Sequence, residues 1–213
     1  DMLNRGGEAV RPVPSRPDFA LDPQALRRLL DDDIARGDRP FCVIAQVGSI
    51  NVGAIDPLSA LADLCAEYGL WLHGDGACGT PAAMLPELRE RFAGLERLDS
   101  LSFDPHKWLP VSYDAGCLLV REAEKLRRTF SLTAPYLRGI PPSEYEGLDF
   151  LEYGPEMSRS FRALKVWMTL RQQGAAGVRA NLRAGIGLAR RAHELALAHP
   201  EFEVLHEPQL YVY

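Results

Sequence analysis

The chain has 213 residues, of which 46% are hydrophobic and 25% charged, and its 24 Lys+Arg against 29 Asp+Glu give a formal net charge of −5. This composition is typical of a globular protein and excludes disordered, collagen-like and small disulfide-bonded classes. The sequence has neither an apolar run of about 20 residues nor the apolar core of a signal peptide, so we expect a soluble, cytoplasmic protein with no membrane partner. Because basic residues are scattered among acidic ones, we also expect no nucleic-acid partner.

The first elements follow the order helix, strand, helix, strand. Residues 1–22 are rich in proline and predict an irregular lead-in. An Asp-Pro pair and apolar residues at helical spacing predict a helix over 23–36. The apolar run 41–47 predicts a strand buried on both faces of a parallel sheet. A second Asp-Pro pair opens a predicted helix over 57–69, and 70–73 follows as a strand, so the order is that of a crossover unit.

The rest of the chain continues the alternation and ends in long helices. The expected strands are 98–103, 116–120 and 201–205, and the expected helices are 122–128, about 157–173 and about 175–198. The proline-rich and glycine-rich segment 131–156 predicts a long functional loop. Together these elements predict an α/β fold.

The four cysteines and the end of the chain carry two further expectations. Cys42, Cys65, Cys78 and Cys117 lie far apart without CxxC spacing, which favours reduced thiols over a disulfide or a zinc site, so no metal is expected. The sequence stops within the apolar run 210–213, which has the pattern of an unfinished strand. We therefore expect a segment of a longer polypeptide.

One candidate site residue stands at the end of the strand predicted near residue 73. Asp75 follows that strand and is itself followed by small residues, Gly76 and Ala77, which allow a flat ligand to approach closely. Open α/β sheets bind ligands at this end of their strands. The alternative is a structural role in which Asp75 caps the next helix.

A second candidate is the lysine of the run Asp104–Leu109. Lys107 follows a short apolar strand and precedes Trp108, an apolar setting that would disfavour its charged form. A partly desolvated amine can act as a nucleophile toward a carbonyl. The alternative is an ordinary solvated surface lysine.

Taken together, these motifs resemble the pyridoxal-phosphate-dependent decarboxylase family, in the branch that includes aromatic-L-amino-acid decarboxylases. The resemblance runs from about residue 41 to 202 and is carried by Gly48–Pro57, Trp71–Asp75, Asp104–Leu109 and Ser158–Lys165. It implies the PLP-dependent transferase fold type I (aspartate-aminotransferase-like), with a mixed, mostly parallel sheet flanked by helices. Residues 1–175 would be the later part of the large cofactor-binding domain, and 176–213 the connecting helix and start of the small C-terminal domain.

The resemblance assigns a role to each residue around the lysine. Lys107 would form a Schiff base with the aldehyde of pyridoxal 5'-phosphate (PLP), and Asp75 would pair with the pyridine nitrogen and keep it protonated. Ala77 would lie against one face of the ring. Asp104 and His106 would contact the cofactor or its phosphate, with a purely structural histidine as the alternative for His106.

Four other positions bear on the resemblance. Ser49 and Ile50 stand where the family often has two threonines, so Ser49 keeps one cofactor-binding hydroxyl and Ile50 loses the other. Cys78 replaces a customary aromatic residue. Tyr136 matches the mobile-loop tyrosine that supplies a proton to the substrate carbon, and it favours simple decarboxylation over aldehyde formation. The alternative for Tyr136 is a packing residue.

The function implied by the resemblance is that of a lyase. The chain would decarboxylate an L-amino acid, with an aromatic substrate favoured, to the amine and CO2, as a homodimer whose active site lies at the interface. The alternatives are a PLP-dependent lyase acting on another amino acid and a non-catalytic remnant of the fold. No glycine-rich phosphate loop leading into a helix precedes Lys107, so we expect this segment alone to hold PLP poorly.

Overall fold

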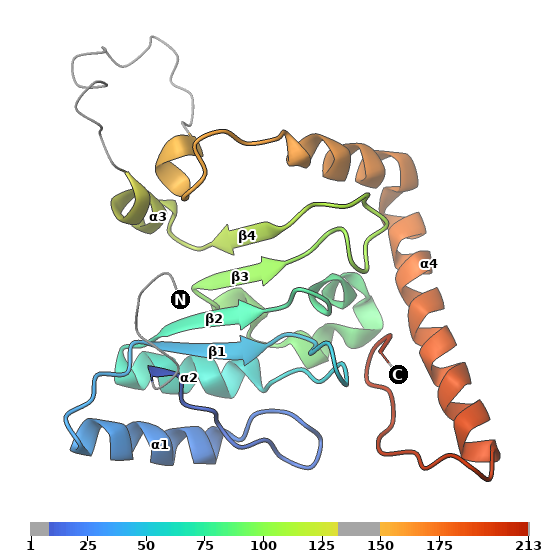
Figure 1. The fold of residues 1–213 in the computed structure, drawn as a ribbon, viewed down its shortest axis with the longest axis horizontal. Coiled ribbons are helices and arrows are strands. Elements are labelled where there is room, and N and C mark those ends of the chain that lie inside the picture. Colours follow the sequence, from blue (N-terminus) through green and yellow to red (C-terminus); the bar gives the residue numbers. More distant parts are fainter. Residues whose placement is uncertain (1–8, 132–149, 213) are drawn as a thin grey trace.

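Four strands form one sheet in the order β1-β2-β3-β4 in the computed structural model, which describes residues 9–131 and 150–212 (Figure 1). The strands are β1 (Cys42–Gln46), β2 (Trp71–Asp75), β3 (Ser100–Phe103) and β4 (Cys117–Val120). The first three are parallel, and β4 runs antiparallel to β3. The predicted mixed, mostly parallel sheet is therefore confirmed.

Helices flank this sheet and connect its strands. They are α1 (Pro23–Ala35), α2 (Leu58–Tyr68), α3 (Ala123–Phe130) and α4 (Arg162–Ala198), with short 3-10 helices η2 (Thr80–Met84), η3 (Pro86–Phe92), η4 (Leu95–Arg97) and η6 (Phe150–Tyr153). The Asp22 side chain accepts a hydrogen bond from the Gln24 N–H at the start of α1, and Gly69 ends α2 with a φ of 67°. The three helices predicted before residue 131 are confirmed.

The sheet is covered on one face by α1 and α2 and is open on the other. Val43 and Ala45 of β1 are buried in one core with the apolar side chains of both helices, whereas Ile44 between them is 59% exposed. Successive side chains of a strand point to opposite faces, so Ile44 marks the uncovered face. The prediction that this strand is buried on both faces is therefore wrong for the described residues, because no helix among them covers Ile44.

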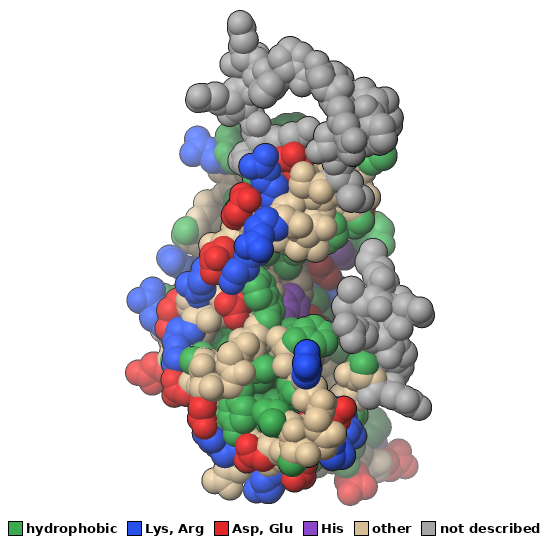
Figure 2. Space-filling view, turned by 90° about the vertical axis from the view of Figure 1, so that its left-hand side faces the viewer, with side chains coloured by type: hydrophobic (Ala, Val, Ile, Leu, Met, Phe, Trp, Pro, Cys, Tyr) green, Lys and Arg blue, Asp and Glu red, His purple; other side chains and the backbone are tan. Residues whose placement is uncertain are grey.

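The surface at the starting ends of β1 to β3 carries charges of both signs. Figure 2 shows acidic and basic side chains interspersed there, with hydrophobic side chains gathered in one area.

No helix within 9–131 and 150–212 is long and apolar enough to cross a membrane.

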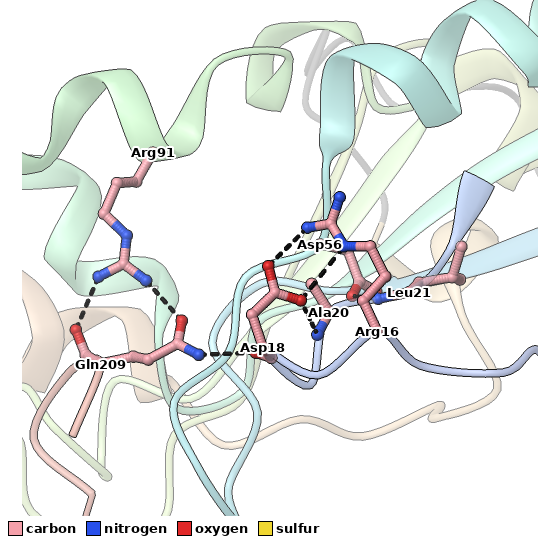
Figure 3. Close-up of polar contacts among 7 residues, drawn as sticks. All are labelled: Arg16, Asp18, Ala20, Leu21, Asp56, Arg91 and Gln209. Carbon is pink, nitrogen blue, oxygen red and sulfur yellow. Dashed lines mark hydrogen bonds and ion pairs between the residues drawn. The ribbon is translucent and has the colours of Figure 1, made fainter. Parts of the chain in front are cut away.

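A buried carboxylate joins the lead-in to the sheet. Asp56 is only 4% exposed, and one of its oxygens accepts a hydrogen bond from the backbone N–H of Leu21 at 2.7 Å (Figure 3). The other oxygen accepts one from the backbone N–H of Gln46, also at 2.7 Å. Its own N–H donates to the Gln46 carbonyl at 2.9 Å. Burial raises the pKa of Asp56, and the two N–H donors partly offset that effect. One side chain thus fixes the lead-in, the end of β1 and the start of α2.

The long helix α4 replaces two predicted helices. It begins at Arg162 rather than near 157, and Gly174, with a φ of 65°, interrupts its helical geometry close to the expected boundary. Val178 and Leu182, beyond that break, are buried against Leu85 and Leu109. The second half of α4 therefore backs the segment that follows β3.

The strands predicted at 201–205 and within 210–213 are not found among residues 199–212. This segment has no regular secondary structure, and Phe202 and Leu205 are exposed. The backbone N–H and C=O groups of a strand need hydrogen-bond partners on a neighbouring strand. The described residues provide no such strand beside this segment. The alternating pattern of 201–205 therefore gave the wrong prediction.

We predict that Asp56→Ala lowers the free energy of unfolding by about 3 kcal/mol, because two buried N–H groups lose their acceptors. Asp56→Asn should also destabilise, since its amide NH2 would face one of the two donors. Urea denaturation measures both changes. Asp63→Asn is the matched control, because the Asp63 carboxylate is exposed and pairs, among the described residues, only with Arg97. An equal loss in that variant would contradict the prediction.

Candidate active site

The loops that follow β2 and β3 are hydrogen-bonded to each other at the carboxyl ends of these strands. The Gly76 N–H donates to the Ser102 carbonyl at 2.9 Å, and the Asp104 N–H donates to the Ala77 carbonyl at 3.1 Å. Asp75 is the last residue of β2, and Lys107 lies in the loop after β3. The two parts of the candidate site found in the sequence thus meet at one edge of the sheet.

Lys107 is an ion-paired amine and not a desolvated one. Its Nζ lies 2.9 Å from Asp104 Oδ2, and its side chain is 37% exposed. The hydrogen bond to Asp104 raises the pKa of Lys107, and the negative charge of Asp75 acts in the same direction. The expectation that apolar neighbours disfavour the charged form is wrong, because the carboxylate outweighs the slight burial.

Asp75 is held by its own turn. It is half-buried, and its Oδ1 accepts a hydrogen bond from the Ala77 N–H at 3.2 Å. The next helix, η2, begins at Thr80 and has no side-chain cap. The alternative in which Asp75 caps that helix is therefore wrong, and its carboxylate stays at the strand end on the side of Lys107.

Glycines allow the loop after β1 to pack directly on the loop after β2. A Cβ added at Gly48 would lie 2.4 Å from the Gly79 Cα, a distance that no side chain tolerates. Gly48 also has a φ of 90°, which favours glycine. Only glycines at these two positions let the segments around Ser49 and Cys78 come together.

Ser49 itself is turned into its own loop. Its Oγ accepts a hydrogen bond from the Ala54 N–H at 3.3 Å, and its N–H donates to the Ala54 carbonyl at 2.9 Å. Ile50 beside it is exposed. The structure places Ser49 near Gly79 but gives it no contact with Lys107, so its cofactor-binding role stays a prediction.

His106 is tied to the segment that leads into β4. Its Nδ1 lies 2.8 Å from the Ala115 carbonyl oxygen, and its ring meets Tyr113 edge-on with 4.8 Å between centroids. These contacts are those of a structural histidine, while the cofactor role of His106 stays a prediction. Tyr136 lies outside the described residues.

Sequence reasoning missed a polar network on the open face of the sheet. Trp71 Nε1 donates to Ser100 Oγ at 2.8 Å, and the same oxygen lies 2.7 Å from His73 Nδ1. Ser102 Oγ lies 3.4 Å from His73 Nε2, and Ser102 is in register with Asp75. Burial lowers the pKa of His73. The signal was the alternation in β2, which places His73 and Asp75 on one face.

Tyr211 is a second residue that the sequence did not indicate. Its ring stacks on Trp108, the neighbour of Lys107, with 4.2 Å between centroids. No local pattern links these residues, because they are far apart in the sequence.

Other features of the described residues lie away from this site. A hollow of about 680 Å³ runs along β3 and β4, lined in part by Phe92, Leu101 and Leu119, and contains none of the predicted site residues. Within 9–131 and 150–212 no three His, Cys, Asp or Glu side chains are grouped to hold a metal ion. All four cysteines are unpaired, as predicted.

The arrangement brings an amine, two carboxylates and small residues to one strand edge. Lys107 can add to a carbonyl once it loses its proton, and Asp104 is placed to accept that proton. Asp75 can pair with a cationic group at the same edge. This set of groups is suited to a ligand with both a carbonyl and a basic ring nitrogen.

Comparison with known proteins connects these residues with one family. The sequence model of the family described as "Pyridoxal-dependent decarboxylase conserved domain" matches residues 5–212. An aromatic-L-amino-acid decarboxylase of Bacillus atrophaeus is 40% identical over 186 residues, 87% of this chain and 39% of that protein. A histidine decarboxylase of Drosophila melanogaster is 39% identical over 197 residues, 92% of this chain and 23% of that protein.

A solved structure agrees with the sequence relatives. The structure of Oryza sativa TDC with PLP and tryptamine superposes with a TM-score of 0.91 at 31% identity, covering 99% of this chain and 43% of that one. The chain thus spans less than half the length of each of these three proteins.

We predict that Asp104→Asn lowers the pKa of Lys107, because the amine loses its anionic partner. In the ligand-free protein, reductive methylation of Lys107, followed by peptide mass spectrometry across pH, should then begin at lower pH than in the unsubstituted protein. Glu122→Gln is the matched control, since Glu122 pairs with Lys125 at 2.8 Å. Unchanged labelling of Lys107 in Asp104→Asn would exclude Asp104 as the source of the raised pKa.

Proposed function

Because the chain belongs to the pyridoxal-dependent decarboxylase family, we propose that it is part of an enzyme that uses PLP to decarboxylate an L-amino acid to its amine and CO2. The observation that carries the proposal is the meeting of Lys107, Asp104 and Asp75 at adjacent strand ends. The activity is proposed for the complete polypeptide, since the chain spans only 39% of the Bacillus relative.

The residues present fit PLP. Lys107 offers the amine for its aldehyde, Asp75 a carboxylate for its pyridine nitrogen, and Ala77, whose carbonyl binds the loop of Asp104, a small side chain beside the ring. When bound, PLP supplies an electron sink for the charge left on the substrate carbon after CO2 departs. Asp75 would favour this withdrawal by keeping a proton on the ring nitrogen.

Asp104 has a separate task in this proposal. An ammonium group has no lone pair, so Lys107 must lose a proton before it bonds to an aldehyde. Asp104 Oδ2, 2.9 Å from Nζ, is placed to take that proton. We assign to Ser49 and His106 the binding of the cofactor or its phosphate. For His106 this would add to its observed contact with Ala115.

An aromatic substrate is the favoured one. Relatives carry the names aromatic-L-amino-acid decarboxylase and tryptophan decarboxylase, at 40% and 35% identity. A phenylacetaldehyde synthase of a Rosa hybrid cultivar is also similar, at 36% identity. Tyr136, which we propose as the residue that gives a proton to the substrate carbon, favours the amine-forming outcome over the aldehyde.

The assembly and location are further parts of the proposal. We propose a homodimer with the active site at its interface, supported by exposed apolar side chains on the first half of α4, Leu164, Trp167 and Met168. A cytoplasmic location agrees with the unpaired cysteines. We place the domain boundary near residue 175, next to the break at Gly174, with 1–175 in the large domain and 176–213 leading into the small one.

We predict that Lys107→Ala in the complete polypeptide abolishes the visible absorption of bound PLP and lowers CO2 release by at least about 100-fold. Borohydride reduction of the unsubstituted protein should add the cofactor mass to the peptide that contains Lys107. Lys125→Ala is the control, since Lys125 is ion-paired but lies in α3. A retained absorption band in Lys107→Ala would refute the assignment of the amine.

We predict that Tyr136→Phe leaves PLP binding intact and lowers amine formation by roughly 100-fold, because a phenol that donates a proton is lost. Absorbance titration with PLP and chromatography of the amine and aldehyde products measure the two effects. Tyr153→Phe, a change in η6, is the control. Unchanged amine formation would remove Tyr136 from the mechanism.

A further inference from the structure

Residues 113–116 lead into β4 and contact the loop that carries Lys107. The Tyr113 ring meets the His106 ring edge-on, with 4.8 Å between centroids. Ala115 is 1% exposed, and its backbone nitrogen and carbonyl oxygen lie 3.0 Å and 2.8 Å from His106 Nδ1. Because two residues of the segment contact one imidazole ring, the position of residues 113–116 sets the position of His106, the neighbour of the lysine.

Gly116 extends these contacts to the ion-pair partner of the amine. A Cβ added at Gly116 would lie 3.4 Å from Asp104 Oδ1, so this backbone lies directly against the carboxylate. The other oxygen of that carboxylate, Oδ2, lies 2.9 Å from Lys107 Nζ. Residues 113–116 therefore border both the His106 ring and the ion pair of the candidate site.

Asp114 joins this segment to the first half of α4, which lies next to the loop that leads into β4 (Figure 1). Its Oδ2 accepts a hydrogen bond from Arg162 Nε at 3.0 Å, and its Oδ1 lies 3.8 Å from Lys165 Nζ. Hydrogen bonds that the carboxylate accepts from its own backbone N–H and from Arg162 lower the pKa of Asp114, so it stays charged at neutral pH. One carboxylate thus binds two cations that lie one helical turn apart.

The two halves of α4 are attached to the rest of the molecule in different ways. Val178 and Leu182, beyond the break at Gly174, are buried in an apolar core. Within 162–173, all of which the structure describes, no side chain is buried, and Val166 packs only partly against that core. The contacts with Asp114 therefore provide a large share of the attachment of the first half.

We propose that Asp114 is a positioning residue of the Lys107 site, which fixes residues 113–116 to α4. Through the neighbours of Asp114 on the chain, this attachment holds the His106 ring and the Asp104 carboxylate in place beside the amine. Partly exposed ion pairs contribute little to the free energy of unfolding, so the role is one of geometry rather than of stability. The meaning of this role for catalysis rests on the proposed function.

The first test follows His106 in the complete polypeptide without PLP. Asp114→Asn should raise the rate at which diethyl pyrocarbonate modifies His106 by about fivefold, which corresponds to the loss of about 1 kcal/mol from the contacts that hold residues 113–116. Peptide mass spectrometry measures this rate, with the exposed His199 as an internal reference. Asp114→Glu should retain the rate of the unsubstituted protein, since a longer carboxylate can still reach both cations.

Arg162→Gln removes the same hydrogen bond from the side of α4. It should also speed the modification of His106, and the double variant with Asp114→Asn should lose less protection than the sum of the two single variants. This second route to the loss of the bond applies equally if Asp114→Asn does not fold. An unchanged rate in Arg162→Gln would then overturn the proposal.

Glu87→Gln is the matched control, because it removes a different ion pair of α4. Glu87 pairs with Arg183 in the second half of the helix, with 2.7 Å between Oε1 and Nε. This variant should leave the modification rate of His106 unchanged. An increase equal to that of Asp114→Asn would assign the effect to general loosening of α4 and would contradict a specific role of Asp114.

The second test concerns the complete polypeptide with PLP. Asp114→Asn should weaken PLP binding by about threefold to fivefold and shift the pH at which the visible absorption band of bound PLP titrates, because the surroundings of Lys107 change. Asp114→Glu should restore both quantities. A merely structural role would lower the unfolding midpoint and leave the titration of the band unchanged.

Two results would overturn the proposal: an unchanged His106 modification rate in Asp114→Asn, or strictly additive effects of Asp114→Asn and Arg162→Gln. If the unsubstituted protein binds no PLP, the proposed function fails, while the His106 rates still decide whether Asp114 holds residues 113–116. The two failures are therefore distinguishable. An Asp114→Asn variant that keeps its unfolding midpoint, yet shows faster modification and a shifted titration, supports the proposal.

Discussion

The arrangement of this molecule depends on one buried carboxylate with two backbone donors. Asp56 binds the N–H groups of Leu21 and Gln46, and so joins the lead-in to the end of β1 beside the apolar core that Leu21 shares with Ala45. A buried anion without donors would be expensive, and buried N–H groups without an acceptor nearly as much. The carboxylate and the two N–H groups therefore require each other. Their bonds fix the end of β1 at the point where the loop that carries Gly48 begins.

From that fixed end, close backbone contact carries the geometry to the chemistry. The approach of Gly48 to Gly79 leaves no room for a side chain, so the loop after β1 fixes the position of the loop after β2. The hydrogen bond from Asp104 to Ala77 then links the loop after β2 to that after β3. Backbone contacts thus locate the loop that carries Lys107, and the ion pair with Asp104 holds its amine in place even though the side chain is partly exposed.

The sequence predicted correctly those elements whose signals lie within a few residues of one another. The Asp-Pro pairs, the helical spacing of leucines and the glycine after α2 each act within a few residues, so those elements were found. The environment of Lys107 was misjudged, although Asp104, three residues earlier, was in view, because apolar neighbours along the chain need not surround the amine in space. The exposure of Ile44 and the contact of Tyr211 with Trp108 depend on distant segments, which no local pattern records.

The contact of Tyr211 with Trp108 has a consequence for folding, because Gln209, two residues before Tyr211, donates a hydrogen bond from Nε2 to the Asp18 carbonyl at 2.8 Å (Figure 3). That bond joins groups separated by 191 positions, so it closes a loop of nearly the whole chain. Contacts of such high sequence separation form late, because the entropy of closing the loop must be offset by structure already in place. The sheet and its helices can therefore assemble first, and the stack of Tyr211 on Trp108 is completed only when this long loop shuts.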